Sequence, residues 1–105
     1  MFSKKKTLNS DFSLNLEKLS AAVAAAETGG CRFGYGATHN NCHGIKNFYT
    51  GEMIKFPDKK KSHAAFKKLW ARKYKKFPNL RLAKIYTGND RAKTWLKNVT
   101  NYYNN

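Results

Sequence analysis

A regular spacing of apolar residues near the start of the chain constrains its fold most. These residues recur every three or four positions: Leu16, Leu19, Val23 and Ala26. This is the pattern of one face of an amphipathic helix, and most residues between them are strong helix formers. Gly29 and Gly30 follow, and glycines favour a left-handed exit from a helix. The spacing predicts a helix from about Ser13 that leaves Glu27 in its last turn.

Three more helices are expected after an irregular, glycine-rich stretch from 29 to 61. Ser62 is the expected cap of the second helix, whose apolar side carries Phe66, Leu69, Trp70 and Tyr74. The third runs from Leu80 to Tyr86 and is ended by Gly88. The fourth is capped by Asn89 or Asp90, and its apolar face is Ala92, Trp95, Leu96, Val99 and Tyr102 or Tyr103.

Apolar and aromatic residues around Gly51, from Lys46 to Phe56, predict a short β-hairpin that Pro57 ends. The expected fold class is therefore α+β and mainly helical, with a small β-lobe. A chain of 105 residues fits one domain. We expect a basic flexible arm over 1–12 and a single domain over 13–105.

Charge indicates the sign of the partner. The chain has 21 Lys and Arg against 6 Asp and Glu, a net charge of +15. Such a field attracts polyanions, which include nucleic acid, anionic lipid and the bacterial cell wall. The lysine-rich side of the second helix, with aromatic residues nearby, is the best argument for a nucleic-acid-binding module. The core-like spacing of those aromatic residues argues against it.

The sequence predicts no membrane span, because its longest apolar run, 21–26, is far short of roughly 20 residues. Lys4, Lys5 and Lys6 resemble the start of a signal peptide, but no hydrophobic segment follows them. Two explanations stay open: a mature form with an added Met, or export without an N-terminal signal.

Cys31 and Cys42 flank a glycine-rich loop, and a disulfide between them would contribute about 3 kcal/mol. It would also indicate an oxidising destination. The alternatives are two reduced thiols, or zinc bound with His39 and His43, although the spacing does not match a regular zinc framework. We expect the disulfide, with no metal and no cofactor.

Among the six carboxylates, Glu27 is the unusual one because it follows six residues that are all Ala or Val. Partial burial and the negative end of the helix dipole would both raise its pKa toward the range of a general acid. Glycosidic cleavage needs such a protonated carboxyl group. The alternative is that Glu27 only pairs with a basic residue. Asp11 and Glu17 are expected to be solvated, Asp58 to form a surface ion pair and Asp90 to cap a helix.

Two motifs, Ala24-Ala25-Ala26-Glu27-Thr28-Gly29-Gly30 and Asn40-Asn41-Cys42-His43-Gly44-Ile45-Lys46, resemble the signature of the bacterial and phage glucosaminidase family. Phe56, Ser62 and the segment 86–90 follow in the order that the family shows. The family consists of lysozyme-like peptidoglycan hydrolases, and the resemblance covers roughly residues 16–103. It implies a lysozyme-like fold with a cleft between the helical body and the β-lobe.

The resemblance also implies roles for individual residues. Glu27 would be the catalytic acid, Tyr86 a cleft residue near the cleaved bond, and Glu52 a second carboxylate in the β-lobe. The implied substrate-binding residues are Asn40, Asn41, His43 and Asn89. The sequence departs from the family where Cys42-His43 replaces Leu-Phe and where Asn89 stands at an Asp position.

The expected function is hydrolysis of β-1,4 bonds in peptidoglycan, of the N-acetylglucosaminidase type. A lytic transglycosylase or a muramidase acting on the same substrate stays open, as does a non-catalytic module that binds wall or nucleic acid. The expected partners are peptidoglycan glycan strands and the anionic wall rather than nucleic acid. We expect a monomer that is secreted, periplasmic or wall-associated, or one that a phage encodes and releases to the wall.

Overall fold

The computed structural model describes residues 14–105 and is mainly helical over this range. Its elements are α2 (Leu16–Thr28), α3 (Gly34–His39), α4 (Lys59–Leu69), the π-helical turn η1 (Trp70–Tyr74), α5 (Leu80–Thr87) and α6 (Ala92–Asn104). The expected arm over 1–12, with Asp11 in it, lies outside the described residues. Within the described part of the chain, no helix is long and apolar enough to cross a membrane.

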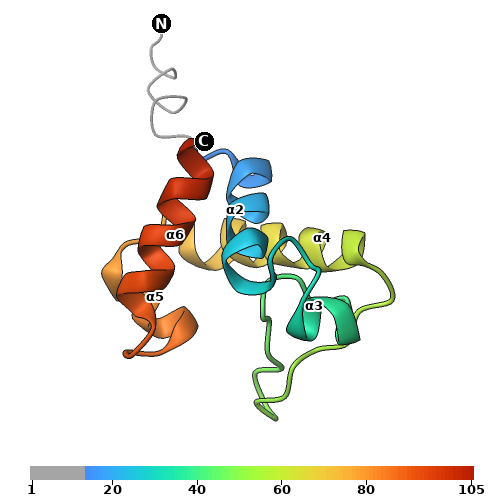
Figure 1. Ribbon diagram of the computed structural model, residues 1–105. Helices are drawn as coiled ribbons and strands as arrows, with labels where there is room; N and C mark the ends of the chain where they lie inside the picture. Colours follow the sequence, from blue (N-terminus) through green and yellow to red (C-terminus); the bar gives the residue numbers. More distant parts are fainter. Residues whose placement is uncertain (1–13) are drawn as a thin grey trace, which may run out of the picture.

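Helices α2 and α6 pack side by side and run in opposite directions (Figure 1). The backbone N–H of Asn15, just before α2, donates to the hydroxyl of Tyr103 near the end of α6. Helix α5 packs on α6, while α4 crosses next to α2. This pairing carries the C-terminal end of α2, and with it Glu27, to the start of α6.

The hydrophobic core forms where α2, α4, η1, α5 and α6 meet. Its buried members are Leu19, Ala22, Val23, Phe66, Trp70, Ala83, Ala92, Trp95 and Val99. The aromatic rings of Phe66 and Trp70 stack at 5.2 Å, and the Trp70 indole N–H donates to the Lys76 carbonyl. The prediction that the aromatic residues of the second helix face inward is confirmed for these two, which are fully buried. The basic residues between and after them, such as Lys68, Arg72 and Lys73, are exposed.

The boundaries of α2 and α5 agree well with the sequence. Asn15 caps α2, and Gly29, at φ +61°, ends it as predicted. The N–H groups of Gly29 and Gly30 donate to carbonyls in the last turn, an arrangement typical of glycine-terminated helices. Helix α5 begins at Leu80, capped by Asn79, and ends before Gly88.

Two expected caps are wrong. Helix α4 begins at Lys59, and its cap is Asp58, whose carboxylate accepts from the Lys61 N–H. Ser62 is instead buried within the helix. Helix α6 begins after Arg91 with no side-chain cap, so neither Asn89 nor Asp90 caps it.

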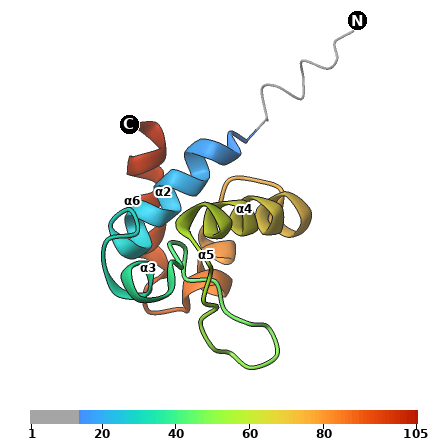
Figure 2. The ribbon, with the colours of Figure 1, turned by 90° about the vertical axis from the view of Figure 1, so that its right-hand side faces the viewer.

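The β-lobe is not formed in the described residues. Between α3 and α4 the chain makes one isolated antiparallel bridge, between Lys46 and Met53. The Asn47 N–H donates to the Glu52 carbonyl at 2.7 Å, and the Asn47 side chain accepts from two loop N–H groups. These bonds close a turn without extending a strand ladder. The result is a loop that projects from the helical body (Figure 2).

A disulfide joins Cys31 and Cys42, as predicted. Between them lies the short helix α3, in a stretch that the sequence indicated to be irregular. Thr28 ties the two ends of this loop together, because its hydroxyl accepts from the Cys31 N–H and donates to the Cys42 carbonyl. Gly36 is needed here, since a Cβ atom at this position would lie 2.7 Å from the Cys31 Cα.

Candidate active site

The candidate site centres on the Glu27 carboxyl group, at the end of α2. The chain passes closely over it at Gly44, where an added Cβ would lie 3.3 Å from Glu27 Oε1. Gly44 also has φ +70°, which disfavours other residues. Gly44, the last residue of the segment from Asn41 to Gly44, therefore lies directly against the Glu27 carboxyl group.

Burial raises the pKa of the Glu27 carboxyl above its ordinary value of 4.5. Three groups oppose this rise: the Arg91 guanidinium, the Trp95 indole N–H and the Lys46 ammonium, in decreasing order. Glu27 is neither fully exposed nor held in a tight ion pair. It can therefore keep a proton at a higher pH than a solvated glutamate.

Trp95 is the most enclosed of these neighbours, at 2% exposed. Its Nε1 is buried and makes no hydrogen bond of normal geometry with any described residue. This N–H nevertheless lies close enough to Glu27 to favour the carboxylate form. It is an available donor for the negative charge that remains once Glu27 has released its proton.

Tyr86 reaches the same place from α5. Its hydroxyl donates to the backbone carbonyl of His43, and its ring lies 5.3 Å from that of Trp95. Burial and the nearby Glu27 carboxylate raise the pKa of the Tyr86 hydroxyl well above 10. Tyr86 therefore acts as a neutral donor that holds the 42–44 segment against Glu27.

Asn41 and His43 are 0% exposed and do not present their side chains to solvent. The Asn41 amide donates to the carbonyls of Ile45 and Ile54, and its oxygen accepts from the Ile45 N–H. Asn41 thus fastens both sides of the projecting loop. In this conformation it supports the site without lining it.

A buried polar network surrounds the His43 ring. Ser20 Oγ lies 3.0 Å from His43 Nε2 and 2.6 Å from His63 Nδ1. Ser62 Oγ lies 3.1 Å from His43 Nδ1 and also accepts from the Cys42 N–H. Burial lowers the pKa of His43 to about 3, so the ring is neutral near pH 7. The network holds the backbone whose carbonyl Tyr86 binds.

The other expected site residues lie further out. Asn40 donates from its side chain to the carbonyls of Phe56 and Pro57. Glu52 lies on the exposed projecting loop, and Asn89 lies in the exposed turn before α6. The structure therefore brings together Glu27, Tyr86 and the His43 backbone, while Glu52 and Asn89 stay at the surface.

The remaining carboxylates have other partners or positions. Glu17 is exposed, as expected, and it also pairs with Lys67 of α4 at the surface. Asp58 caps α4, and Asp90 lines a small hollow beside Arg91 and Trp95. A metal-binding alternative is not supported, because the disulfide occupies both cysteine sulfurs. Residues 14–105 contain no cluster of three or more His, Cys, Asp and Glu side chains suited to a metal.

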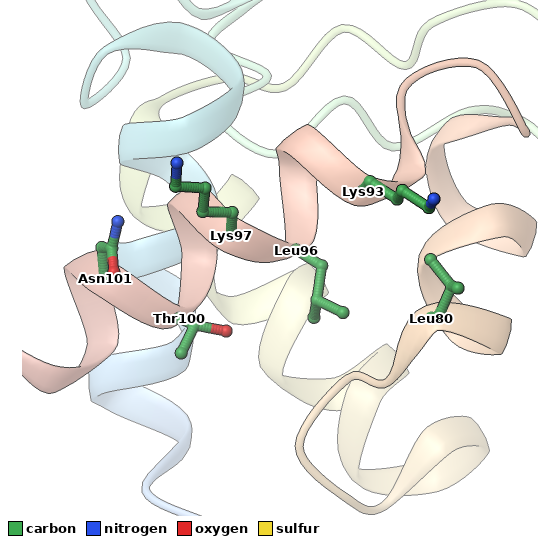
Figure 3. Close-up of a pocket in the computed structure, with 6 residues that line it drawn as sticks. All are labelled: Leu80, Lys93, Leu96, Lys97, Thr100 and Asn101. Carbon is green, nitrogen blue, oxygen red and sulfur yellow. The ribbon is translucent and has the colours of Figure 1, made fainter.

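An open hollow of about 430 Å³ adjoins the site. Gly44 and Tyr86 lie in its wall, together with residues of the projecting loop, η1 and α5. A separate hollow of about 350 Å³ lies between α5 and α6, with Leu80 and Leu96 in its wall and Lys93 and Lys97 beside them (Figure 3). The first hollow shares Gly44 and Tyr86 with the surroundings of Glu27, and the small hollow beside Asp90 shares Arg91 and Trp95 with them.

Comparison of the chain with known protein families, with curated proteins and with solved structures finds no match. The resemblance to the glucosaminidases therefore stays a prediction from the sequence motifs.

Proposed function

We propose that this protein is a peptidoglycan hydrolase of the N-acetylglucosaminidase type, with Glu27 as its general acid. The observation that carries the proposal is the half-buried Glu27 carboxyl, whose pKa is raised, at the end of α2 next to an open hollow. A general acid works best when its pKa lies near the working pH. Burial raises the pKa of Glu27 toward that range.

In the proposed reaction, the Glu27 carboxylic acid donates its proton to the glycosidic oxygen as the bond from that oxygen to C1 breaks. The bonding electron pair leaves with the oxygen, so positive charge develops at C1. The Trp95 N–H then stabilises the Glu27 carboxylate that remains. Tyr86 keeps the backbone at Gly44 in place during this step.

The positive charge at C1 must be met by a nucleophile. The positions of the other described carboxylates do not favour any of them for this role. Glu17 and Asp58 have other partners, Glu52 lies on the exposed loop, and Asp90 is exposed in the turn before α6. The substrate's own acetamido oxygen can bond to C1 instead. Water then bonds to C1 as the bond from C1 to the acetamido oxygen breaks, and the Glu27 carboxylate takes a proton from that water. Attack by a sugar hydroxyl would give an anhydro product, the lytic transglycosylase outcome.

The proposed setting is the bacterial cell wall, with the protein outside the cytoplasm and acting as a monomer. The net charge of +15 supports attraction to an anionic wall, and the disulfide is typical of an oxidising compartment. A nucleic-acid-binding module would use the lysines of α4. However, the aromatic residues that could stack on bases there, Phe66 and Trp70, are buried.

The test compares wild type with Glu27→Gln on purified cell walls. The substitution keeps the shape of the side chain but removes the proton, so cleavage should fall by about a hundredfold or more. Glu17→Gln is the matched control, and its rate should stay close to wild type. Analysis of the released muropeptides then identifies the reducing-end sugar, and with it the bond cleaved and the hydrolytic or anhydro outcome. Equal cleavage by Glu27→Gln and wild type would refute the proposal.

A further inference from the structure

The hollow beside Glu27 is an open groove with three walls. Residues 44–48 and Gly51 of the projecting loop form one wall. Leu69, Lys73 and Tyr74, at and next to the π-helical turn η1, form the second, and Ile85 and Tyr86 of α5 form the third. We name this surface the loop groove. Gly44 and Tyr86 connect it to the Glu27 carboxyl group.

The lining of the loop groove combines positive charge with apolar surface. It contains the ammonium groups of Lys46 and Lys73, and no acidic residue is part of it. Phe48 is 87% exposed and Ile85 is 60% exposed, so the apolar side chains of both are available for contact with a ligand. Tyr49, which is 92% exposed, packs edge-to-face on Phe48 at the tip of the loop. Exposed apolar groups gathered at one groove are typical of binding sites.

This combination fits a ligand that has flat apolar faces and negative charge at intervals. A sugar ring offers C–H faces to an aromatic side chain, and the lactyl and peptide substituents of wall glycan carry carboxylates. A nucleic acid also has flat faces and negative charge. The loop groove, however, has two cations in its lining, whereas a nucleic acid carries a phosphate on every nucleotide, so the groove matches the sparser carboxylates of wall glycan better.

We propose that the loop groove binds the acid-bearing glycan strand of the cell wall, and that Lys46 and Lys73 make the protein prefer it to neutral glycan. This inference rests on the proposed function and specifies its substrate class. Each lysine would contact a substrate carboxylate in a partly exposed setting. Interactions of this kind change affinity by about two- to fivefold each. Loss of both should therefore reduce the preference by about tenfold.

The test uses two preparations of the same purified walls, one native and one with its carboxylates converted to amides. The groove variant is Lys46→Gln with Lys73→Gln. The matched control is Lys93→Gln with Lys97→Gln, which removes the same charge from the separate hollow on α6 (Figure 3). Initial cleavage rate and wall binding by co-sedimentation are measured for each protein on both preparations.

The α6 control should keep the wild-type preference for native walls, and the preference of the groove variant should be smaller by about tenfold. Because Lys46 also acts on Glu27, its loss could change the rate of the acid step. That change would affect both preparations equally and leave their ratio unaltered. Equal losses on native and amidated walls would therefore contradict the proposal, as would a comparable loss of preference in the α6 control.

Failure of the proposed function gives a different result. If neither wild type nor Glu27→Gln cleaves walls, the binding preference for native walls still tests the loop groove. Binding of single-stranded DNA, measured for the same proteins, tests the nucleic-acid alternative. DNA binding that depends on Lys46 and Lys73, with no preference for native walls, would overturn the inference.

Discussion

The hydroxyl group of Tyr86 donates a hydrogen bond to the backbone carbonyl of His43. This bond joins α5 to the segment that follows the disulfide, 43 residues earlier in the chain. The same segment places Gly44 against Glu27. A single phenol thus links three parts of the chain at the candidate site, which makes its removal informative.

Tyr86→Phe should lower the free energy of unfolding by about 1–3 kcal/mol, because it leaves a partly buried carbonyl without its donor. Denaturant unfolding measures this change. Tyr74→Phe, which removes a hydroxyl from a neighbouring aromatic side chain, is the matched control and should cost less. The idea of a Tyr86 tether fails if the two variants are equally stable.

Replacement of Trp95 should change the pH dependence of activity. The Trp95 N–H favours the Glu27 carboxylate, so Trp95→Phe should raise the pKa of Glu27 further. Because the acid must be protonated to act, the alkaline limb of the rate profile should move to higher pH. Tyr102→Phe, an exposed substitution on α6, should leave the limb in place. An unchanged limb in Trp95→Phe would show that the indole N–H does not influence the acid.

Glu27 should also make stability depend on pH. Its pKa is raised in the folded protein, so the unfolded chain loses this proton first as the pH rises above 4.5. Wild type therefore loses stability as the pH rises through the folded pKa. Glu27→Gln cannot ionise, so its melting temperature relative to wild type should increase over that window and then level off. A constant difference from pH 4 to pH 8 would contradict the raised pKa.

The buried His43 should make the free energy of unfolding depend on pH in the acid range. Burial lowers its pKa from 6.5 to about 3, so the unfolded chain binds a proton first as the pH falls. Stability should decline between these two values, by at most on the order of 5 kcal/mol at about 1.4 kcal/mol per pKa unit. His43→Gln should flatten this part of the unfolding curve, whereas His39→Gln in α3 should keep its slope. Parallel curves for wild type and His43→Gln would exclude His43 as the source.

The disulfide should be worth about 3 kcal/mol, from the entropy of the short loop that it closes. Intact mass under non-reducing conditions should be two hydrogens lower than that of the reduced protein. Thermal unfolding with and without reductant measures the stabilisation. Two thiols that alkylate freely in the folded, air-exposed protein would overturn this assignment.

The sequence predicted those features that depend on neighbouring residues. The four-residue spacing of Leu19 and Val23 and the paired glycines 29 and 30 gave α2 and its end. Asp58 shows the limit of that reasoning. Both Asp58 and Ser62 are residue types that cap helices well, and the apolar periodicity begins at Phe66, so the pattern favoured Ser62, the nearer of the two. The three lysines between the two caps gave no apolar signal for the first turn.

Features that depend on contacts between distant parts of the chain could not be predicted from the sequence as well. Trp95 was predicted to be a core residue, but its proximity to Glu27 follows only from the antiparallel packing of α2 and α6. His43 and Asn41 were predicted as substrate-binding positions, yet their burial depends on Ser20, Ser62 and the backbone of the projecting loop. The hairpin was predicted from apolar residues around Gly51. Instead, the Asn47 side chain binds backbone N–H groups there and closes a turn, an alternative that competes with strand pairing.

The π-helical turn at the end of α4 has a consequence for insertions and deletions. In η1 the Lys75 N–H bonds to the Trp70 carbonyl, five residues back, so this turn holds one residue more than an α-helical turn would. Deletion of the exposed Ala71 could convert it to an ordinary α-turn and leave the chain on either side in register. Helix α2 is α-helical and has no extra residue of this kind at the exposed Ala21. Deletion of Ala21 would rotate the rest of that helix by about 100° and carry Glu27 away from Gly44.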